Sequence, residues 1–251
     1  TISYEQTIHA YPNGGGSYIV SRDNLGILPA QIAGAALLTD YILTVAVSIS
    51  SSVAQIASAF PGLYRWRVEL AIFFIMLIMI INLRGVKESG VTFAIPTYFF
   101  IVMMYITIIV GLVRYFAGTL GIVTNPPELT ILAEPQALGL FLLLKAFASG
   151  TASVTGVEAI SDGITAFRQP RSKNAGTTLI FMALILGSML IGVTFLSQQV
   201  SAVPSEHETL VSQISRTVFD GRGILYLMTI VGTTVILVMA ANTAFADFPR
   251  L

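Results

Sequence analysis

Long apolar runs separated by short polar segments dominate the chain. A helix that crosses about 30 Å of hydrocarbon needs roughly 20 mostly apolar residues, and several stretches approach or exceed that length. They cover residues 28–60, 68–83, 94–116, 137–167, 176–197 and 223–245, and the fourth of them is interrupted. The pattern therefore predicts an all-α integral membrane protein with about six transmembrane helices.

The composition agrees with this assignment. Hydrophobic residues make up 55% of the chain and charged residues only 10%, against roughly 25% charged in soluble domains. The 13 basic and 13 acidic residues cancel, so the charge gives no reason to expect nucleic acid as a partner. Cysteine is absent, and the two histidines lack metal-ligand or catalytic-triad spacing. We expect neither an enzyme nor a bound cofactor.

Basic residues beside the spans indicate the orientation. If the first span runs outward from the cytoplasm, the inner side holds Arg22, Arg84, Lys87, Arg168, Arg171, Lys173 and Arg250. The outer side then holds Arg65, Arg67, Arg114, Arg216 and Arg222. The larger number of basic residues on the inner side favours this orientation. We expect the protein in the cell (plasma) membrane, which would be the inner membrane of a prokaryote.

A short amphipathic helix is expected after the fifth apolar stretch. Ser205 and Glu208 have the spacing of a capping box, and Leu210, Ile214 and Val218 follow at helical spacing. We interpret this segment as a structural helix that lies on the membrane surface.

Asp40 is the candidate for membrane chemistry in the first span. No other charged residue occurs between Asp23 and Arg65, and a carboxylate near the middle of a membrane costs at least about 2.5 kcal/mol. Thr44 and Ser48 follow on the same helical face. Such a row of oxygens suits a monovalent cation, a proton path or a polar substrate. In the alternative, the hydroxyls bond to their own helix and Asp40 has a structural partner.

The fourth stretch interrupts its own apolar pattern. After Lys145, residues 149–156 contain two glycines and four hydroxyl residues, and Glu158 follows. This predicts a broken helix, which transporters use to bind ions and substrates at the midplane. Glu158 is then a candidate proton carrier. The alternative is a kinked helix in which Glu158 pairs with Lys145.

The last span carries weaker polar signals. They are Thr233, Thr234, Asn242 and Thr243. Single hydroxyls and amides commonly bond between membrane helices, so we interpret these four as packing residues.

Four segments resemble the amino acid-polyamine-cation superfamily of transporters. They are residues 11–18 (YPNGGGSY), the Asp40-Tyr41 span, 155–158 (TGVE) and 246–251 (ADFPRL). Within that superfamily the chain is most similar to the KimA-type potassium-proton symporters, which are often labelled amino acid permeases. The resemblance covers nearly the whole chain.

The resemblance implies a fold and a set of site residues. The fold is a LeuT-like five-plus-five inverted repeat, of which residues 1–251 would be one transmembrane segment, helices 3 to 8, truncated at both ends. Potassium is expected at Asp40, Thr44, Ser48 and Thr155, and proton coupling at Glu158. Tyr41 and Lys145 would support this site.

The expected function is secondary active transport, with proton-coupled potassium uptake by alternating access. The alternatives are an amino acid-proton permease of the same superfamily and a non-transporting membrane scaffold or receptor. Potassium and protons would be the transported species. The expected partners are the lipid bilayer, a cation or small-molecule substrate, the remaining helices of the transporter and, as an open alternative, a second copy in a homodimer.

Overall fold

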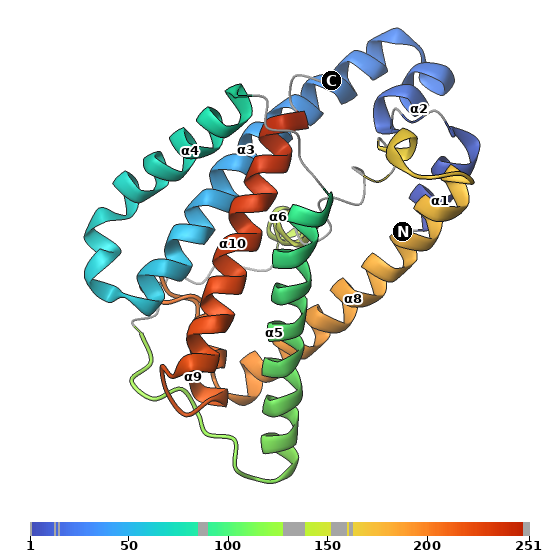
Figure 1. Cartoon of the computed structure of the whole chain (residues 1–251). Helices are drawn as coiled ribbons and strands as arrows, with labels where there is room; N and C mark the ends of the chain where they lie inside the picture. Colours follow the sequence, from blue (N-terminus) through green and yellow to red (C-terminus); the bar gives the residue numbers. More distant parts are fainter. Residues whose placement is uncertain are drawn as a thin grey trace. The chain divides into compact units, whose positions relative to one another are not determined.

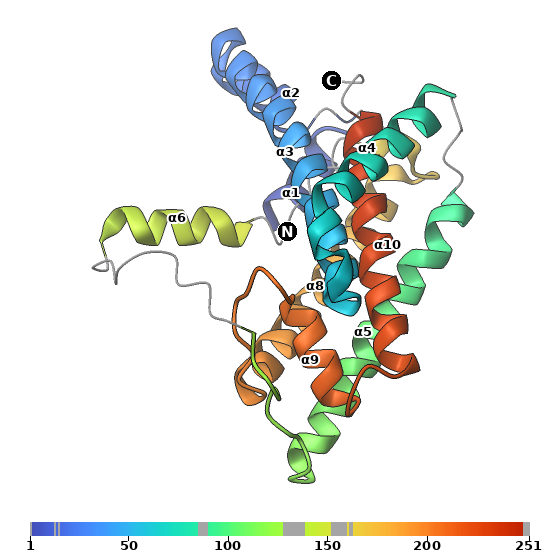
Figure 2. The ribbon, with the colours of Figure 1, turned by 90° about the vertical axis from the view of Figure 1, so that its left-hand side faces the viewer.

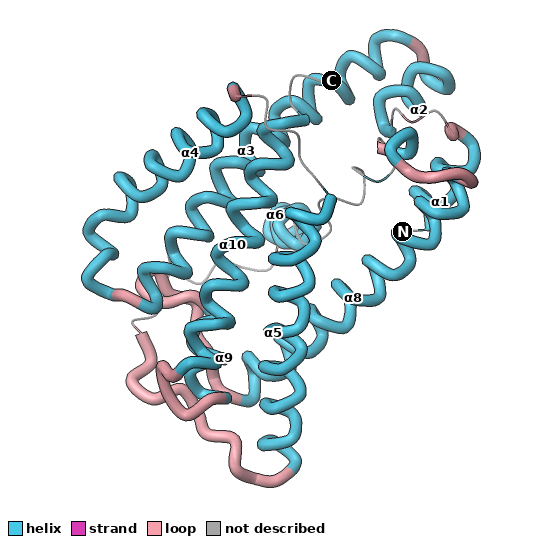
Figure 3. The backbone as a smooth tube through the Cα atoms, viewed as in Figure 1, coloured by secondary structure: helices cyan, strands magenta, loops and turns pink. Residues whose placement is uncertain are grey.

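The computed structural model describes residues 2–12, 14, 16–84, 90–127, 139–151, 160 and 163–247. Within these ranges the backbone is helical or forms loops, with no strand (Figure 3). This confirms the all-α class that the apolar pattern predicts.

The described part of the chain forms the helices that are labelled in Figure 1. They are α1 (Ile2–Ala10), α2 (Gly16–Leu25), α3 (Ile27–Ala59), α4 (Arg67–Leu83), α5 (Gly90–Phe116), α6 (Leu140–Thr151), α8 (Arg171–Gln199), α9 (Leu210–Val218) and α10 (Ile224–Asp247). Two 3₁₀ helices, η1 (Pro61–Trp66) and η3 (Ile164–Ala166), lie between them.

The chain forms two compact units, which are described separately below. Unit 1 comprises Thr1–Leu37 and Ile131–Ser188, and unit 2 comprises Leu38–Thr130 and Met189–Leu251. Two of the three boundaries between the units fall within α3 and α8, and the third, between Thr130 and Ile131, lies outside the described residues.

Five described helical segments are long and apolar enough to cross a membrane. They are Ile27–Ala59, Pro61–Leu83, Phe93–Phe116, Arg171–Gln199 and Ile224–Phe245. They correspond to five of the six predicted stretches, and the ends shift because the helices continue into polar flanks. The fourth stretch contributes the shorter apolar helix Leu140–Gly150. Of the residues 149–156 predicted to break the helix, 149–151 still belong to α6, and 152–156 lie outside the described ranges.

Unit 2 is organised around α10. This helix runs alongside α5 in both ribbon views (Figures 1 and 2). A small buried core joins Ile49 of α3, Ile78 of α4 and Ala241 of α10. The helix surfaces therefore meet through a few closely packed apolar side chains, while many other large apolar side chains are exposed, as a lipid-facing surface requires.

Unit 1 has its own core where α1 meets the start of α8. Ile8 of α1 and Ile164 of η3 are fully buried against Ala175 and Leu179 of α8. These contacts fix the short N-terminal helix against the first turns of a membrane-spanning helix.

The short helix predicted after the fifth stretch exists as α9, but two details of the prediction are wrong. Its N-cap is Thr209, whose hydroxyl accepts a hydrogen bond from the amide of Ser212. Ser205 instead accepts a bond from the amide of His207, at 3.1 Å. Most of α9 is buried, including Gln213 and Ile214, so its apolar face packs within unit 2 and does not face lipid.

Candidate functional site

A polar stripe runs along α3 inside unit 2. Asp40, Thr44, Ser48 and Ser52 are each four residues apart and Gln55 follows three later, so all five lie on one face of the helix. Asp40 is exposed and Thr44 half-buried, whereas Ser48 is 9% exposed and Ser52 is fully buried. The stripe thus leads from an accessible carboxylate to buried hydroxyl groups.

Two groups on this stripe have no partner among the described residues. In the described part of the chain, the Asp40 carboxylate makes no hydrogen bond or ion pair. The Oγ atom of Ser52 is buried and has no hydrogen-bond partner there either. A carboxylate in an apolar span and a buried hydroxyl are both unfavourable without a polar partner, so a bound polar ligand would stabilise both groups.

The far end of the stripe is bonded to the start of α9. The hydroxyl of Thr209 donates to Oε1 of Gln55 at 2.9 Å, and its amide donates to Oγ of Ser58 at 3.0 Å. The hydroxyl of Ser58 itself donates to the backbone oxygen of Ala54 at 2.7 Å. The residue that caps α9 is therefore fixed to the last turns of α3.

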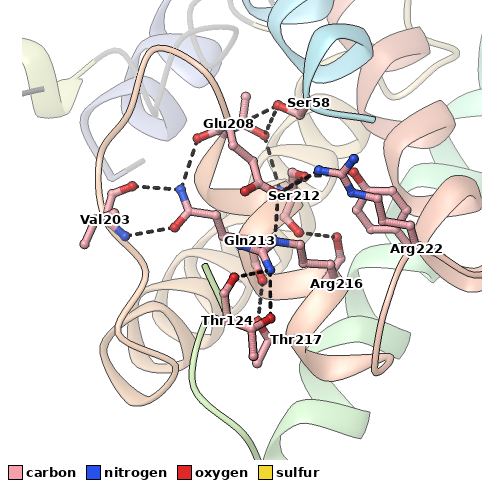
Figure 4. A network of polar contacts seen from close by, with 12 residues as sticks. Ser58, Thr124, Val203, Glu208, Ser212, Gln213, Arg216, Thr217 and Arg222 are labelled. Carbon is pink, nitrogen blue, oxygen red and sulfur yellow. Dashed lines mark hydrogen bonds and ion pairs between the residues drawn. The ribbon is translucent and has the colours of Figure 1, made fainter. Parts of the chain in front are cut away.

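Next to this cap lies a nearly buried charge network, shown in Figure 4. Oε1 of Glu208 accepts a bond from the hydroxyl of Ser212 and one from Nε of Arg216, both at 2.8 Å. The Ser212 hydroxyl also lies 2.9 Å from the hydroxyl of Tyr226, on α10. Glu208 pairs with Arg216 at 2.8 Å and with the more exposed Arg222 at 3.9 Å. Because its charge is paired within the protein, we interpret the network as structural.

The same network fastens two loops to α9. Gln213 bonds to both backbone atoms of Val203, donating to its oxygen at 2.8 Å and accepting from its amide at 3.0 Å. Nη1 of Arg216 donates to the backbone oxygen of Thr124 at 2.8 Å. Figure 4 shows these contacts converging on α9 from both loops.

The structure places only part of the predicted site. Asp40, Tyr41, Thr44 and Ser48 lie together on α3, within unit 2. Lys145 is exposed on α6, in unit 1. Thr155 and Glu158 fall outside the described residues, so their roles remain predictions.

One of the four polar residues of α10, Asn242, bonds to another helix, as the packing interpretation expects. Oδ1 of Asn242 accepts a 2.8 Å hydrogen bond from Nδ2 of Asn82, on α4. The hydroxyls of Thr233 and Thr243 donate to backbone oxygens of their own helix. Thr234 differs, because its Oγ1 atom is buried without a partner in the described part of the chain.

Sequence comparison identifies the family of this helical protein. The family model described as amino acid permease matches residues 2–251. The chain belongs to the amino acid permease family. The chain is also 48% identical over 251 residues to a protein named potassium transporter KimA, from Bacillus subtilis (strain 168). That alignment covers 100% of this chain but only 41% of the relative, so the chain spans well under half of the relative's length.

These comparisons confirm the resemblance drawn from the four sequence segments. They place the permease in a family of transporters rather than enzymes. Together with the five long apolar helices, they make it a multi-pass membrane protein.

Proposed function

We propose that the permease takes up potassium across the cell membrane, coupled to protons. In this proposal Asp40, Thr44 and Ser48 bind the cation together with Thr155, and Glu158 carries the proton. Support comes from the relative named a potassium transporter, which is 48% identical over the full length of this chain. Because the chain spans only 41% of that relative, further ligands from a longer polypeptide are part of the proposal.

The observation that carries the proposal is the carboxylate of Asp40 at the start of the hydroxyl stripe, which has no partner among the described residues. A single carboxylate supplies one negative charge, which matches a monovalent cation, and hydroxyl oxygens can replace part of its hydration shell. Binding the cation would remove the unfavourable isolated charge in the span.

Buried hydroxyl groups continue the α3 stripe beyond the exposed Asp40 carboxylate. Asp40 is exposed and Ser52 is fully buried, so an ion bound near the carboxylate would have further oxygens ahead of it along the same face. Transporters of this architecture expose a midplane site to each side in turn by moving one group of helices against another.

Proton-coupled amino acid transport is the alternative that an observation favours, because the matching family is described as amino acid permease. In that case residues 149–156 would hold the charged ends of the substrate. The carboxylate of Asp40 disfavours this alternative, since it would repel the carboxylate of an amino acid bound beside it. A non-transporting scaffold would require that this member of a permease family has lost its transport activity.

The test uses the full-length protein in a strain that lacks its own potassium uptake. We expect rescue of growth at low potassium, rubidium uptake, and no labelled amino acid uptake. Asp40→Asn should abolish rubidium uptake, whereas Asp23→Asn, the same change at an exposed site on α2, should not. Rubidium uptake by Asp40→Asn at the parental rate would remove Asp40 from the site.

The coupling role has its own test. Glu158→Gln removes the ionisable proton while keeping the size of the side chain. We expect rubidium uptake that no longer responds to the proton gradient in proteoliposomes of the full-length protein. A normal response to the gradient would assign proton coupling to another group and leave the cation site unaffected.

A further inference from the structure

A hollow in unit 1 lies at the start of α8. Its volume is about 450 Å³, and its lining includes His9 of α1, Pro170, and the first three residues of α8: Arg171, Ser172 and Lys173. This end of α8 begins a 29-residue helix that is apolar enough to cross a membrane. The hollow is therefore at the membrane interface, with two cationic side chains in its wall.

Neither cation has an acidic partner among the described residues. No carboxylate in the described ranges pairs with Arg171 or Lys173. In addition, Nε of Arg171 is buried and has no hydrogen-bond acceptor among the described residues. A buried guanidinium N–H without an acceptor is unfavourable, so Arg171 adds to the lining of the hollow a positive charge that no described acceptor satisfies at Nε.

Backbone donors point to the same kind of ligand. The first helical hydrogen bond of α8 runs from the amide of Asn174 to the oxygen of Pro170, at 3.1 Å. The amides of residues 171–173 precede that bond and have no acceptor within the helix. Such amides, with the positive end of the helix dipole, favour a phosphate or carboxylate group.

The nearest described acid in α1 is engaged elsewhere. Glu5 pairs with His9, with 3.3 Å between Oε1 and Nδ1. His9 is therefore left out of the ligand set. The Glu5 carboxylate lies beside α8 one turn further on, where Oε1 is 3.9 Å from the position of a Cβ atom at Gly176. Asn174 donates to the backbone oxygen of Arg168 at 2.8 Å, which holds the loop that precedes the hollow.

We propose that this hollow binds the phosphate group of an anionic phospholipid. The guanidinium of Arg171, the ammonium of Lys173 and the first amides of α8 would donate to the phosphate oxygens. The lipid source follows from the position of the hollow at the start of a membrane span. Basic pockets on the cytoplasmic side of membrane proteins bind anionic headgroups, and the distribution of Lys and Arg predicts that side for residues 168–174.

The experiment measures binding of a fluorescent phosphatidylglycerol to the full-length protein in detergent. The variant is Arg171→Gln with Lys173→Gln, and the control is Arg22→Gln with Arg84→Gln. Arg22 and Arg84 are exposed and their replacement removes the same net charge. Since charge-assisted bonds are lost only in the first variant, we expect its affinity to fall about tenfold below that of the control.

Equal affinities of the two double variants would overturn the proposal. If the double variant does not fold, Lys173→Gln alone decides the question, because Lys173 is exposed and its replacement leaves the core intact; it should still bind the lipid more weakly than Arg22→Gln. Inorganic phosphate provides the other arm. Displacement of the lipid by inorganic phosphate at equal concentration would assign the hollow to free phosphate and overturn the lipid assignment.

Discussion

Nε of Arg216 lies 2.8 Å from Oε1 of Glu208, and the two side chains are only 13% and 9% exposed. Glu208 precedes α9 and Arg216 is near its end, so the pair spans the helix. It joins the cap of α9 to the loop that contains Thr124, through the second bond of Arg216.

Removing one member of this pair should destabilise the protein strongly. Glu208→Gln leaves Arg216 with a nearly buried, unbalanced charge, and breaking such a pair costs about 3–5 kcal/mol. The matched control is Glu206→Gln, since Glu206 is 60% exposed and lies 3.8 Å from Arg67; an exposed pair contributes at most about 1 kcal/mol. Thermal unfolding of the full-length variants in detergent compares them, and equal melting temperatures would contradict the structural role of Glu208.

The bond between Asn82 and Asn242 should contribute modestly to the contact between α4 and α10. Interhelical hydrogen bonds inside membranes are worth about 0.6 kcal/mol on average. A double-mutant cycle with Asn82→Ala and Asn242→Ala should give a coupling energy of about that size. Because Asn82 also donates to the oxygen of Ile78, the single change alone overstates the bond. A cycle made with Asn82→Ala and Thr243→Ala should give no coupling.

Gly192 on α8 lies at a close helix contact in unit 2. A Cβ atom there would come within 2.8 Å of Cγ2 of Ile108, a β-branched side chain that cannot easily rotate in a helix. Gly192→Ala should therefore destabilise the protein by about 1–3 kcal/mol. At Gly187, on the same helix, an added Cβ would have no neighbour within 4 Å among the described residues. Gly187→Ala should be neutral or stabilise by up to about 1 kcal/mol, and a similar melting temperature for both variants would contradict the close contact.

The membrane spans could be predicted from sequence because the bilayer itself demands a length of apolar helix. The N-cap of α9 could not. Both Ser205 and Thr209 have a hydroxyl that can cap a helix. Thr209 is the cap because it also bonds to Gln55 and Ser58, which lie 154 and 151 residues earlier in the sequence. Local spacing carries no information on contacts of that range.

In the candidate site too, local spacing predicts some features and misses others. The row of Asp40, Thr44 and Ser48 is a property of one helix, so its spacing alone predicts that the three share a face. Spacing does not predict the pairing of Glu208 with Arg216, because a separation of eight residues is two turns, beyond the reach of the usual helical pairs. The position of Glu208, three residues after Ser205, instead indicates a cap that the structure does not form.

Ser52 separates a structural from a functional interpretation of the α3 stripe. Its Oγ atom is buried and unpartnered among the described residues, so Ser52→Ala should leave stability unchanged or raise it, because an unsatisfied polar group is removed. If Ser52 extends the cation site beyond Ser48, the same variant should raise the apparent KM for rubidium roughly two- to tenfold, the equivalent of one lost hydrogen-bond-like contact. The control is Ser50→Ala, an exposed position on another face of α3. Rubidium uptake and melting temperature, measured on the same full-length variants, check this prediction, and an unchanged KM would end the stripe at Ser48.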